Sequence, residues 1–423
     1  MSQSTSPAPP GGYADGVTIL RNRAVTLEDL PAMTWPDLTE WLLGPATEVE
    51  DVIDLFPAVL ARLRAVGLQL DRASMHLGTL HPQLIGFAWT WTAQKAALDE
   101  VKVARFVLQS DAYKLNPIQQ ILEKGVPLRC NLRAAEERAP FPLMKSLAQE
   151  GYTDYLALPL NAGGYYNAIT LATKAEDGFD DGGIAELKRW LRTFGLLMDR
   201  HISHRIAANI LDTYLGEAAG GKVLAGEIER GTGAPIEAII WVSDLRGFSD
   251  LSDRLEGPAV LALLNAYFEC LVTAIEAADG QVLKFVGDGL LAVFPFDPEG
   301  RGKAEVAAAA VEAAEAALRA LDDLNGSPTP DLAALPGWQP LRCGIALHEG
   351  SVFFGNLGAP QRLDFTVIGR AVNEAARVEG LTKELGRPLL ITQPVAARLT
   401  RPLVSLGAHR LRGVSDSVGL FGV

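Results

Sequence analysis

Two aspartates lie at positions where an acidic side chain contributes nothing to packing. Asp244 ends the apolar run IIWVSD, and Asp288 occupies the tip of KFVGDGLLAVF, which has the pattern of a β-hairpin turning at residues 287–289. Such a tip can lie beside the end of a neighbouring strand, where the two carboxylates would repel each other. A divalent cation between them removes that repulsion, and oxygen ligands of this kind suit Mg²⁺ or Mn²⁺ that arrives with a polyphosphate.

Each acid also has an ordinary structural explanation. Gly-Asp is a common pair of turn residues, and Asp244 can cap the turn that follows its strand. The aspartates alone therefore leave both interpretations open, and the surrounding residues must decide between them.

Four sequence strings around these acids together resemble the class III nucleotidyl cyclase catalytic domain, the family of adenylate and guanylate cyclases. They follow one another in the family order between about Ile236 and Val423: SDLRGFSDLSD, KFVGDGLLAVF, RCGIALHEGSVFFGNLG and DFTVIGRAVNEAARVEGL. The upstream strings TYLG and VLAGEIERG resemble the connector that precedes this domain in soluble bacterial members. Because chance would have to reproduce all four strings at once, the resemblance is specific.

The resemblance implies a site with two metal ions, Mg²⁺ or Mn²⁺, held by Asp244, Asp288 and the backbone carbonyl of Leu245. One ion would lower the pKa of the ribose 3′-hydroxyl and polarise the α-phosphate, and the other would bind the triphosphate and stabilise the departing pyrophosphate. Arg342 matches the arginine of the family that binds the triphosphate. Arg412 matches a second basic position, where a guanidinium can bind phosphate through two hydrogen bonds.

Further matches concern the purine and the ribose. Lys284 matches the residue that reads the purine, and a lysine donor suits N1 of adenine, an acceptor, rather than N1 of guanine, which carries a hydrogen. Thr366 occupies the companion position, where many members have Asp; some members of the Thr subgroup respond to bicarbonate. Asn373 and Arg377 lie four residues apart on one helix face and match the pair that orients the ribose and stabilises charge on the α-phosphate.

Two residues depart from the family pattern: Arg370, where family sequences frequently carry Asp, and Glu374. In the family, the metal side and the purine side of each site come from opposite subunits, so the resemblance implies a homodimer with two equivalent sites. The implied activity is adenylate cyclase, the conversion of ATP to 3′,5′-cyclic AMP and pyrophosphate. A catalytically silent nucleotide-binding signalling module and a guanylate cyclase remain as alternatives.

The elements that must position these residues alternate between strands and helices over residues 235–423, which predicts an α/β domain with one helix-covered sheet. The family resemblance implies an α+β sandwich with a ferredoxin-like core. The expected elements are a strand at 236–245, a helix at 257–278, a hairpin at 281–295, a helix at 303–325, a strand pair within 342–358 and a helix at 371–385.

Residues 33–200 mix strand and helix patterns whose order resembles a GAF or PAS-type sensor domain, an α/β fold. The expected elements are helices at 47–66, 117–124, 143–149 and from 183 onward, and the β-prone strings RASMHLGTL, LIGFAWTWT, VPLRCNL, DYLALPL and YYNAITLAT. No ligand motif accompanies this order. The effector of this domain, a small molecule or a protein, is therefore not identified, and the domain could serve only to hold a dimer.

The segments on either side of this domain carry little chemistry. Residues 1–32 are expected to form a disordered leader, and residues 201–234 a helical connector that breaks at Gly216 and again near Gly220. His201 and His204 lie three residues apart but have no further Cys or His nearby, which favours an ordinary helix surface over a metal or haem site.

Two other features of this region concern packing and membrane insertion. Trp89 and Trp91 alternate along a strand, which favours core packing of both on one face. The long uncharged stretch 155–173 is interrupted by Pro and Gly, which predicts two strands and a turn rather than a membrane span.

Composition limits the class of protein. A length of 423 residues suggests two or three domains, and a formal net charge of −13 argues against a nucleic acid as the main partner. Three scattered cysteines, Cys130, Cys270 and Cys343, form neither a disulfide framework nor a CxxC zinc pair. We therefore expect a cytoplasmic protein without a membrane span and without a signal peptide.

Overall fold

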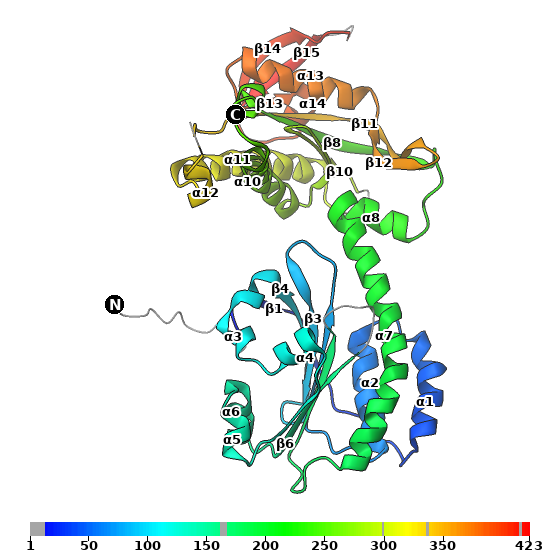
Figure 1. Cartoon of the computed structure of the whole chain (residues 1–423). Helices are drawn as coiled ribbons and strands as arrows, with labels where there is room; N and C mark the ends of the chain where they lie inside the picture. The colour runs from blue at the N-terminus through cyan, green and yellow to red at the C-terminus, as the bar shows by residue number, and fades with distance from the viewer. Residues whose placement is uncertain (1–12, 161–166, 298–299, 336–337, 414–416) are drawn as a thin grey trace. The chain divides into compact units, whose positions relative to one another are not determined.

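The computed structural model describes residues 13–160, 167–297, 300–335, 338–413 and 417–423. The chain divides into two compact units, Met1–Ile210 and Leu211–Val423, and each is described by itself (Figure 1).

The described part of the first unit is built on a seven-stranded antiparallel sheet with the strand order β1-β4-β3-β2-β7-β6-β5. Its strands are β1 (Val17–Ala24), β2 (Arg72–Gly78), β3 (Leu84–Thr92), β4 (Ala97–Ala104), β5 (Leu128–Asn131), β6 (Asp154–Pro159) and β7 (Ala168–Thr173). Its helices are α1 (Trp35–Leu43), α2 (Val52–Ala65), α3 (Asp111–Lys114), α4 (Ile118–Lys124), α5 (Ala135–Arg138), α6 (Pro142–Gln149) and α7 (Asp181–Leu215), with 3-10 turns η1 (Pro45–Glu48) and η2 (Arg105–Gln109). The turn expected between β6 and β7 lies outside the described residues.

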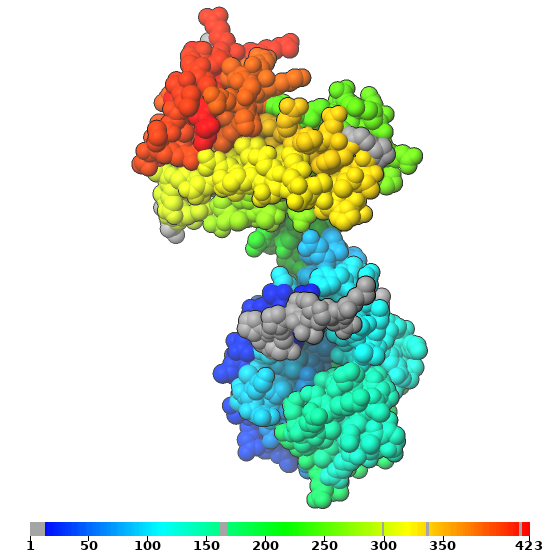
Figure 2. Space-filling view, turned by 90° about the vertical axis from the view of Figure 1, so that its left-hand side faces the viewer, coloured from blue at the N-terminus to red at the C-terminus, as the bar shows by residue number. Residues whose placement is uncertain are grey.

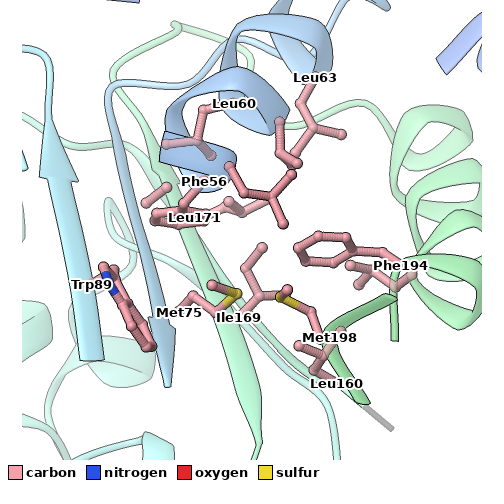
Figure 3. Packing of buried hydrophobic residues seen from close by; sticks show 14 of the residues in the cluster. Phe56, Leu60, Leu63, Met75, Trp89, Leu160, Ile169, Leu171, Phe194 and Met198 are labelled. Carbon is pink, nitrogen blue, oxygen red and sulfur yellow. The ribbon is translucent and has the colours of Figure 1, made fainter. Parts of the chain in front are cut away.

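One face of this sheet packs against α1, α2 and α7 in a single apolar core. Figure 3 shows Phe56 and Leu60 of α2 and Phe194 of α7 facing Leu171 on the sheet. Trp89, which is fully buried, and Trp91 belong to the same cluster, so the prediction that both tryptophans pack on one core face is confirmed. The opposite face is covered by a separate cluster that includes residues of η2, α3, α4 and α6.

The prediction of a disordered leader over residues 1–32 is wrong for Val17–Ala24, which forms strand β1 and pairs antiparallel with β4. Strand β4 was also absent from the expected elements, because the string ALDEVKVA carries three charges. One of them, Glu100, is fully buried and ion-pairs with Arg21 of β1 and with Arg205 of α7. A buried carboxylate needs such partners, and these come from distant parts of the chain.

The expected connector contains one of its two predicted breaks. Helix α7 ends at Leu215 and Gly216 follows with φ +80°, as predicted. The break near Gly220 is wrong, because α8 (Glu217–Leu224) runs through that position. A Cβ on Gly220 would lie 2.6 Å from the carboxylate of Asp212, so this glycine allows α8 to approach the end of α7 closely.

The described residues of the second unit form an eight-stranded sheet with the order β14-β15-β13-β11-β8-β10-β9, and β12 pairs with β11. The strands are β8 (Gly233–Leu245), β9 (Gln281–Val286), β10 (Gly289–Pro295), β11 (Cys343–Ala359), β12 (Arg362–Ile368), β13 (Leu389–Thr392), β14 (Val404–Arg410) and β15 (Ser417–Gly422). The helices are α8, α9 (Phe248–Ser252), α10 (Gly257–Ala277), α11 (Lys303–Gly326), α12 (Pro330–Ala333), α13 (Arg370–Glu384) and α14 (Gln393–Ala396).

The centre of this sheet has the ferredoxin-like order. The sequence β8, α10, β9, β10, α11, β11 is a βαββαβ unit, and its strands lie in the order β11-β8-β10-β9. Alternate residues of β8 separate the two faces: Ile239 and Trp241 pack with α10 and α11, whereas Ala238 and Ile240 pack with α8 and α13. Helices therefore cover both faces, and α11 and α12, in yellow, form much of the surface seen in Figure 2.

One expected element differs. The string RCGIALHEGSVFFGNLG was expected to form a strand pair, but residues 343–359 form the single 17-residue strand β11. This strand pairs antiparallel with β8 from Cys343 to Gly355 and with β12 from Phe353 to Ala359. Two partners in succession keep the long strand extended, so the glycines within it do not mark a turn.

Among the described residues, α10 is long and apolar enough to cross a membrane by length and composition alone. Its Leu263, Tyr267, Leu271 and Ile275 are buried in the core beneath the sheet. One side of α10 therefore packs in the core of the unit.

The three cysteines are free thiols, as expected for a chain without a disulfide framework.

Candidate active site

The two predicted metal ligands meet at one end of the sheet. Leu290 pairs with Ser243, so the turn between β9 and β10 lies beside the end of β8, where Asp244 is located. Gly287 adopts φ +64° in this turn, a conformation that favours glycine. Burial raises the pKa of Asp244, and the negative charge of Asp288 and a hydrogen bond between the two carboxyls raise it further. This arrangement confirms that the aspartates are close together.

Two other predicted residues lie at the same end. The backbone carbonyl of Arg342 accepts a hydrogen bond of 2.7 Å from the backbone N–H of Arg246, two residues beyond Asp244. Arg342 is exposed, whereas the side chain of Leu245 is buried in the core. The strand pairing of β8 with β11 therefore holds Arg342 and the acidic pair at one edge, and the side chain of Arg342 makes no ion pair with another described residue.

An ion pair next to the acids was not predicted from the sequence. Arg246 Nη2 lies 2.9 Å from Glu379 Oε1 of α13, and burial raises the pKa of Glu379. Gly344, which pairs with Asp244, leaves the space for this contact, because a Cβ there would lie 1.9 Å from Arg246 Nη2. The pair fixes α13 to the end of β8. No local pattern indicates this pair, since its partners are more than 130 positions apart in the sequence.

The predicted purine-reading residue has an acidic partner that the sequence analysis missed. Lys284 Nζ lies 3.0 Å from Asp364 Oδ2, and both side chains remain partly exposed. Asp364 lies two residues before Thr366 on β12, so the two share a strand face. Thr366 is buried, and its hydroxyl has no hydrogen-bond partner among the described residues. The alternation of strand residues around Thr366 could have indicated Asp364.

The residues expected to act on the ribose and the phosphates are exposed. Asn373 and Arg377 lie on one face of α13, and neither makes a hydrogen bond or ion pair with another described residue. A Cβ on Gly413 would lie 3.5 Å from Arg377 Nη2, so the guanidinium of Arg377 lies against the segment that carries Arg412. Two arginines are therefore neighbours on an open surface.

The two departures from the family pattern contact each other. Arg370 Nε lies 2.6 Å from Glu374 Oε1, and Glu374 Oε2 lies 3.2 Å from Nε2 of His348. His348 is buried, and burial lowers its pKa. Glu374 therefore points to the sheet, away from the exposed face that carries Asn373.

The predicted residues fall into two sets. Asp244, Asp288 and Arg342 form one, and the purine, ribose and phosphate residues Lys284, Thr366, Asn373, Arg377 and Arg412 form the other. Within the described ranges, no hydrogen bond or ion pair joins a member of one set to a member of the other. One copy of the chain carries both sets without linking them directly.

The described residues contain no group of three or more His, Cys, Asp or Glu side chains that could hold a metal ion. Neither His201, which is partly buried and has a lowered pKa, nor the nearby His204 belongs to such a group. An ion at the acidic pair would take two carboxylates from this chain, and its other ligands would be backbone oxygen, water or substrate.

The family match and the relative described first both fall in the second unit of the chain. The family model for the adenylate and guanylate cyclase catalytic domain matches residues 236–413. An adenylate cyclase of Anabaena cylindrica is 34% identical over 195 residues, which are 46% of this chain and 36% of that protein. The chain spans about a third or less of the length of the curated adenylate cyclases that it matches.

A second relative extends over both units. An uncharacterized protein of Mycobacterium bovis is 28% identical over 398 residues, which are 92% of this chain and 59% of that protein. Among solved structures, the adenylyl cyclase CyaB from P. aeruginosa is 27% identical with a TM-score of 0.39, covering 45% of this chain and 95% of that one. The family match contains every predicted site residue from Asp244 to Arg412. Residues 236–413 of this chain therefore belong to the adenylate and guanylate cyclase catalytic domain family.

Proposed function

We propose that this chain is an adenylate cyclase, which converts ATP to 3′,5′-cyclic AMP and pyrophosphate. The observation that carries the proposal is that Asp244 and Asp288 lie close together at the end of adjacent strands, within the region that matches the cyclase family. Named adenylate cyclases among the relatives support this reaction.

The acidic pair has the chemistry of a site for Mg²⁺ or Mn²⁺. Burial and the charge of Asp288 raise the pKa of Asp244, which means that its ionised form is destabilised in the folded chain. A divalent cation would stabilise that ionised form. Asp244, Asp288 and the backbone carbonyl of Leu245 would hold two ions. When bound, such ions lower the pKa of the attacking hydroxyl and stabilise charge on the phosphates and the departing pyrophosphate.

The chain's own cations would bind and orient the phosphates. Arg342 lies at the metal edge, where it can bind the triphosphate through a bidentate contact. Arg377 and the segment that carries Arg412 lie next to each other and belong to the other set of residues. Arg377 would stabilise the charge that develops on the α-phosphate. Asn373, on the same face of α13, would orient the ribose so that its 3′-oxygen faces the phosphorus.

Lys284 and Thr366 would read the purine, and Asp364 would act as a positioning residue for Lys284. The carboxylate of Asp364 holds the ammonium group 3.0 Å away, which restricts the four-carbon side chain of the lysine. A fixed donor favours N1 of adenine over the protonated N1 of guanine. Thr366 brings a buried hydroxyl without a partner to the same strand face, an arrangement that usually has a functional explanation.

We infer that two copies of the chain form the complete site. The two sets of residues are not joined within one chain, and large apolar side chains remain exposed on the second unit. They lie on α10 and near the β9, β11 and β12 strands: Leu261, Phe285, Val286, Phe353, Leu357 and Ile368. Exposed apolar residues that gather on neighbouring strands support an interface with a second copy.

The first unit is proposed to be a GAF-like sensor or dimerisation domain that regulates the cyclase. Its antiparallel sheet with helices on both faces fits this class, and the order of β2, β3, β5, β6 and β7 agrees with the expected order of elements. A cytoplasmic location follows from the free thiols as part of the same proposal.

A guanylate cyclase is the alternative that the matched family supports, because the family includes both enzymes. A catalytically silent nucleotide-binding module is the alternative from a different class of protein.

Purified full-length chain should form cyclic AMP from ATP with Mn²⁺ or Mg²⁺, and its kcat/KM for ATP should exceed that for GTP by about tenfold or more. Asp244→Asn should lower kcat about 100-fold, because it removes an anionic metal ligand. Asp331→Asn, at an exposed position on α12, is the matched control and should retain full activity. Faster turnover of GTP would support a guanylate cyclase, and no product with any metal would support the silent module.

Asp288→Asn should change the stability of the metal-free protein in a pH-dependent manner. The pKa of Asp244 is raised in the folded chain, so its ionisation opposes folding, and stability is lost as pH rises from about 4 through the raised value. Asp288→Asn should reduce this loss and should abolish stabilisation by added Mn²⁺. Thermal unfolding between pH 4 and pH 8, with and without EDTA, measures both effects. Asp250→Asn on α9 is the control, and an identical pH profile in Asp288→Asn would contradict the coupling.

A mixture of Asp288→Ala and Arg377→Ala chains should regain activity although each variant alone is inactive. If pairing is random in an equal mixture, half of the dimers are mixed and one of their two sites is intact, so about a quarter of the wild-type activity returns. A mixture of Asp288→Ala with Asp244→Ala is the matched control, because both changes lie in the same set and no intact site forms. Mixed dimers that remain inactive would overturn the shared-site arrangement.

Asp364→Asn should weaken discrimination between the purines. Without its carboxylate partner, Lys284 is less restricted, and the ratio of kcat/KM for ATP to that for GTP should fall about fivefold to tenfold. Steady-state rates with both nucleotides measure this ratio, with Asp331→Asn as the control. A ratio equal to that of wild type would show that Asp364 does not position Lys284.

A further inference from the structure

The first unit contains a cavity of about 380 Å³ that is partly open to solvent. It lies on the face of the sheet opposite the core formed with α2 and α7, and residues of β2, β3, β4, α3 and α4 line it. The volume falls within the range of about 300–1,000 Å³ that is typical of small-molecule sites.

Strand alternation explains why the cavity exists. On β2, Ala73, Met75 and Leu77 point into the apolar core, so Arg72 and His76 point to the cavity. On β3, three alternate residues that line the cavity have small side chains: Gly86, Ala88 and Thr90. At these positions β3 offers the helices no large side chain, and a space remains beside Arg72 and His76 of β2.

The walls of the cavity are mostly apolar, and one of the lining residues is charged. Arg72, on the central strand β2, is the charged residue among the described residues that line it. Its guanidinium makes no hydrogen bond or ion pair with any described residue, although the side chain is only partly exposed. A cation in a mostly apolar space costs free energy without an anionic partner, and the described residues do not provide such a partner for Arg72.

The polar groups around Arg72 form no ion pair with it among the described residues. The carboxylate of Asp99 accepts a hydrogen bond of 2.9 Å from the hydroxyl of Tyr13 at the cavity wall. Burial, with a contribution from the charge of Arg72, lowers the pKa of His76 to about 3, so its imidazole is neutral near pH 7. Burial raises the pKa of Tyr155 to about 12, so its phenol keeps its proton. Both groups can donate or accept hydrogen bonds, but neither supplies a negative charge.

We propose that this cavity binds a small, largely apolar molecule that carries one carboxylate, and that Arg72 pairs with this carboxylate. The planar guanidinium matches a carboxylate through two parallel hydrogen bonds, and His76 and Tyr155 supply polar contacts beside it. A doubly charged phosphate fits less well, because the described lining offers no second cation. This inference goes beyond the proposed cyclase activity and does not depend on it.

Isothermal titration of the full-length chain with two acids and their neutral amides tests the proposal. The probes are 1-naphthaleneacetate and decanoate, each paired with its amide of nearly equal size. At least one acid should bind about tenfold or more tightly than its amide, because only the acid pairs with Arg72. Arg72→Gln should reduce the affinity for that acid to the level of the amide, and Arg64→Gln, at an exposed position on α2, should leave it unchanged.

A second variant tests the location. Ala88→Leu places a larger side chain in the cavity and should abolish binding of both the acid and the amide. Arg72→Lys keeps the charge and provides a folded comparison if Arg72→Gln lowers thermal stability. The proposal is overturned if no acid binds more tightly than its amide, or if Arg72→Gln binds the acid as wild type does. Because titration measures heat of binding, loss of cyclase activity has no influence on the result.

Discussion

The pairing register of β8 with β10 forces two carboxylates together, and the arrangement of the second unit depends on this contact. Ser243 is paired with Leu290, so neither Asp244 nor Asp288 can move away without breaking the centre of the sheet. Burial and the charge of Asp288 raise the pKa of Asp244 despite the nearby Arg246, so the charge of Asp244 is only partly compensated. Holding the two carboxylates close together costs free energy, and the apolar core behind this edge of the sheet keeps them in place. This repulsion is the physical basis for a cation site there.

Buried ion pairs fix the parts of each unit that the apolar cores leave undetermined. In the first unit, Glu100 is held between Arg21 and Arg205, which ties the edge strand β1 and helix α7 to the same sheet. In the second unit, Arg246 and Glu379 tie the end of β8 to α13. Removing one partner of such a pair leaves a buried charge, which is costlier than losing an exposed pair. These contacts define a single position for each element that they join.

Local patterns were sufficient to predict most of the catalytic elements. Strand β8, helices α10 and α11 and the hairpin around Asp288 follow from apolar periodicity and turn residues. What the sequence could not provide depends on distant partners. Strand β4 looks too charged until Glu100 meets its arginines, and β11 looks interrupted by glycine until two strands pair with it in succession. The contact between Asp364 and Lys284 likewise depends on β9 and β12 being neighbours, although strand alternation places Asp364 on the face of Thr366.

The unbroken course of β11 has a consequence for how sequences of this kind can change length. Near its start the strand pairs with Asp244, and near its end Gly355 pairs with Thr366. Insertion or deletion of one residue between these points would turn every later side chain to the opposite face of the sheet. Loops elsewhere can lengthen without such an effect. Homologous chains should therefore vary in length around β11 but keep the spacing between its two ends constant.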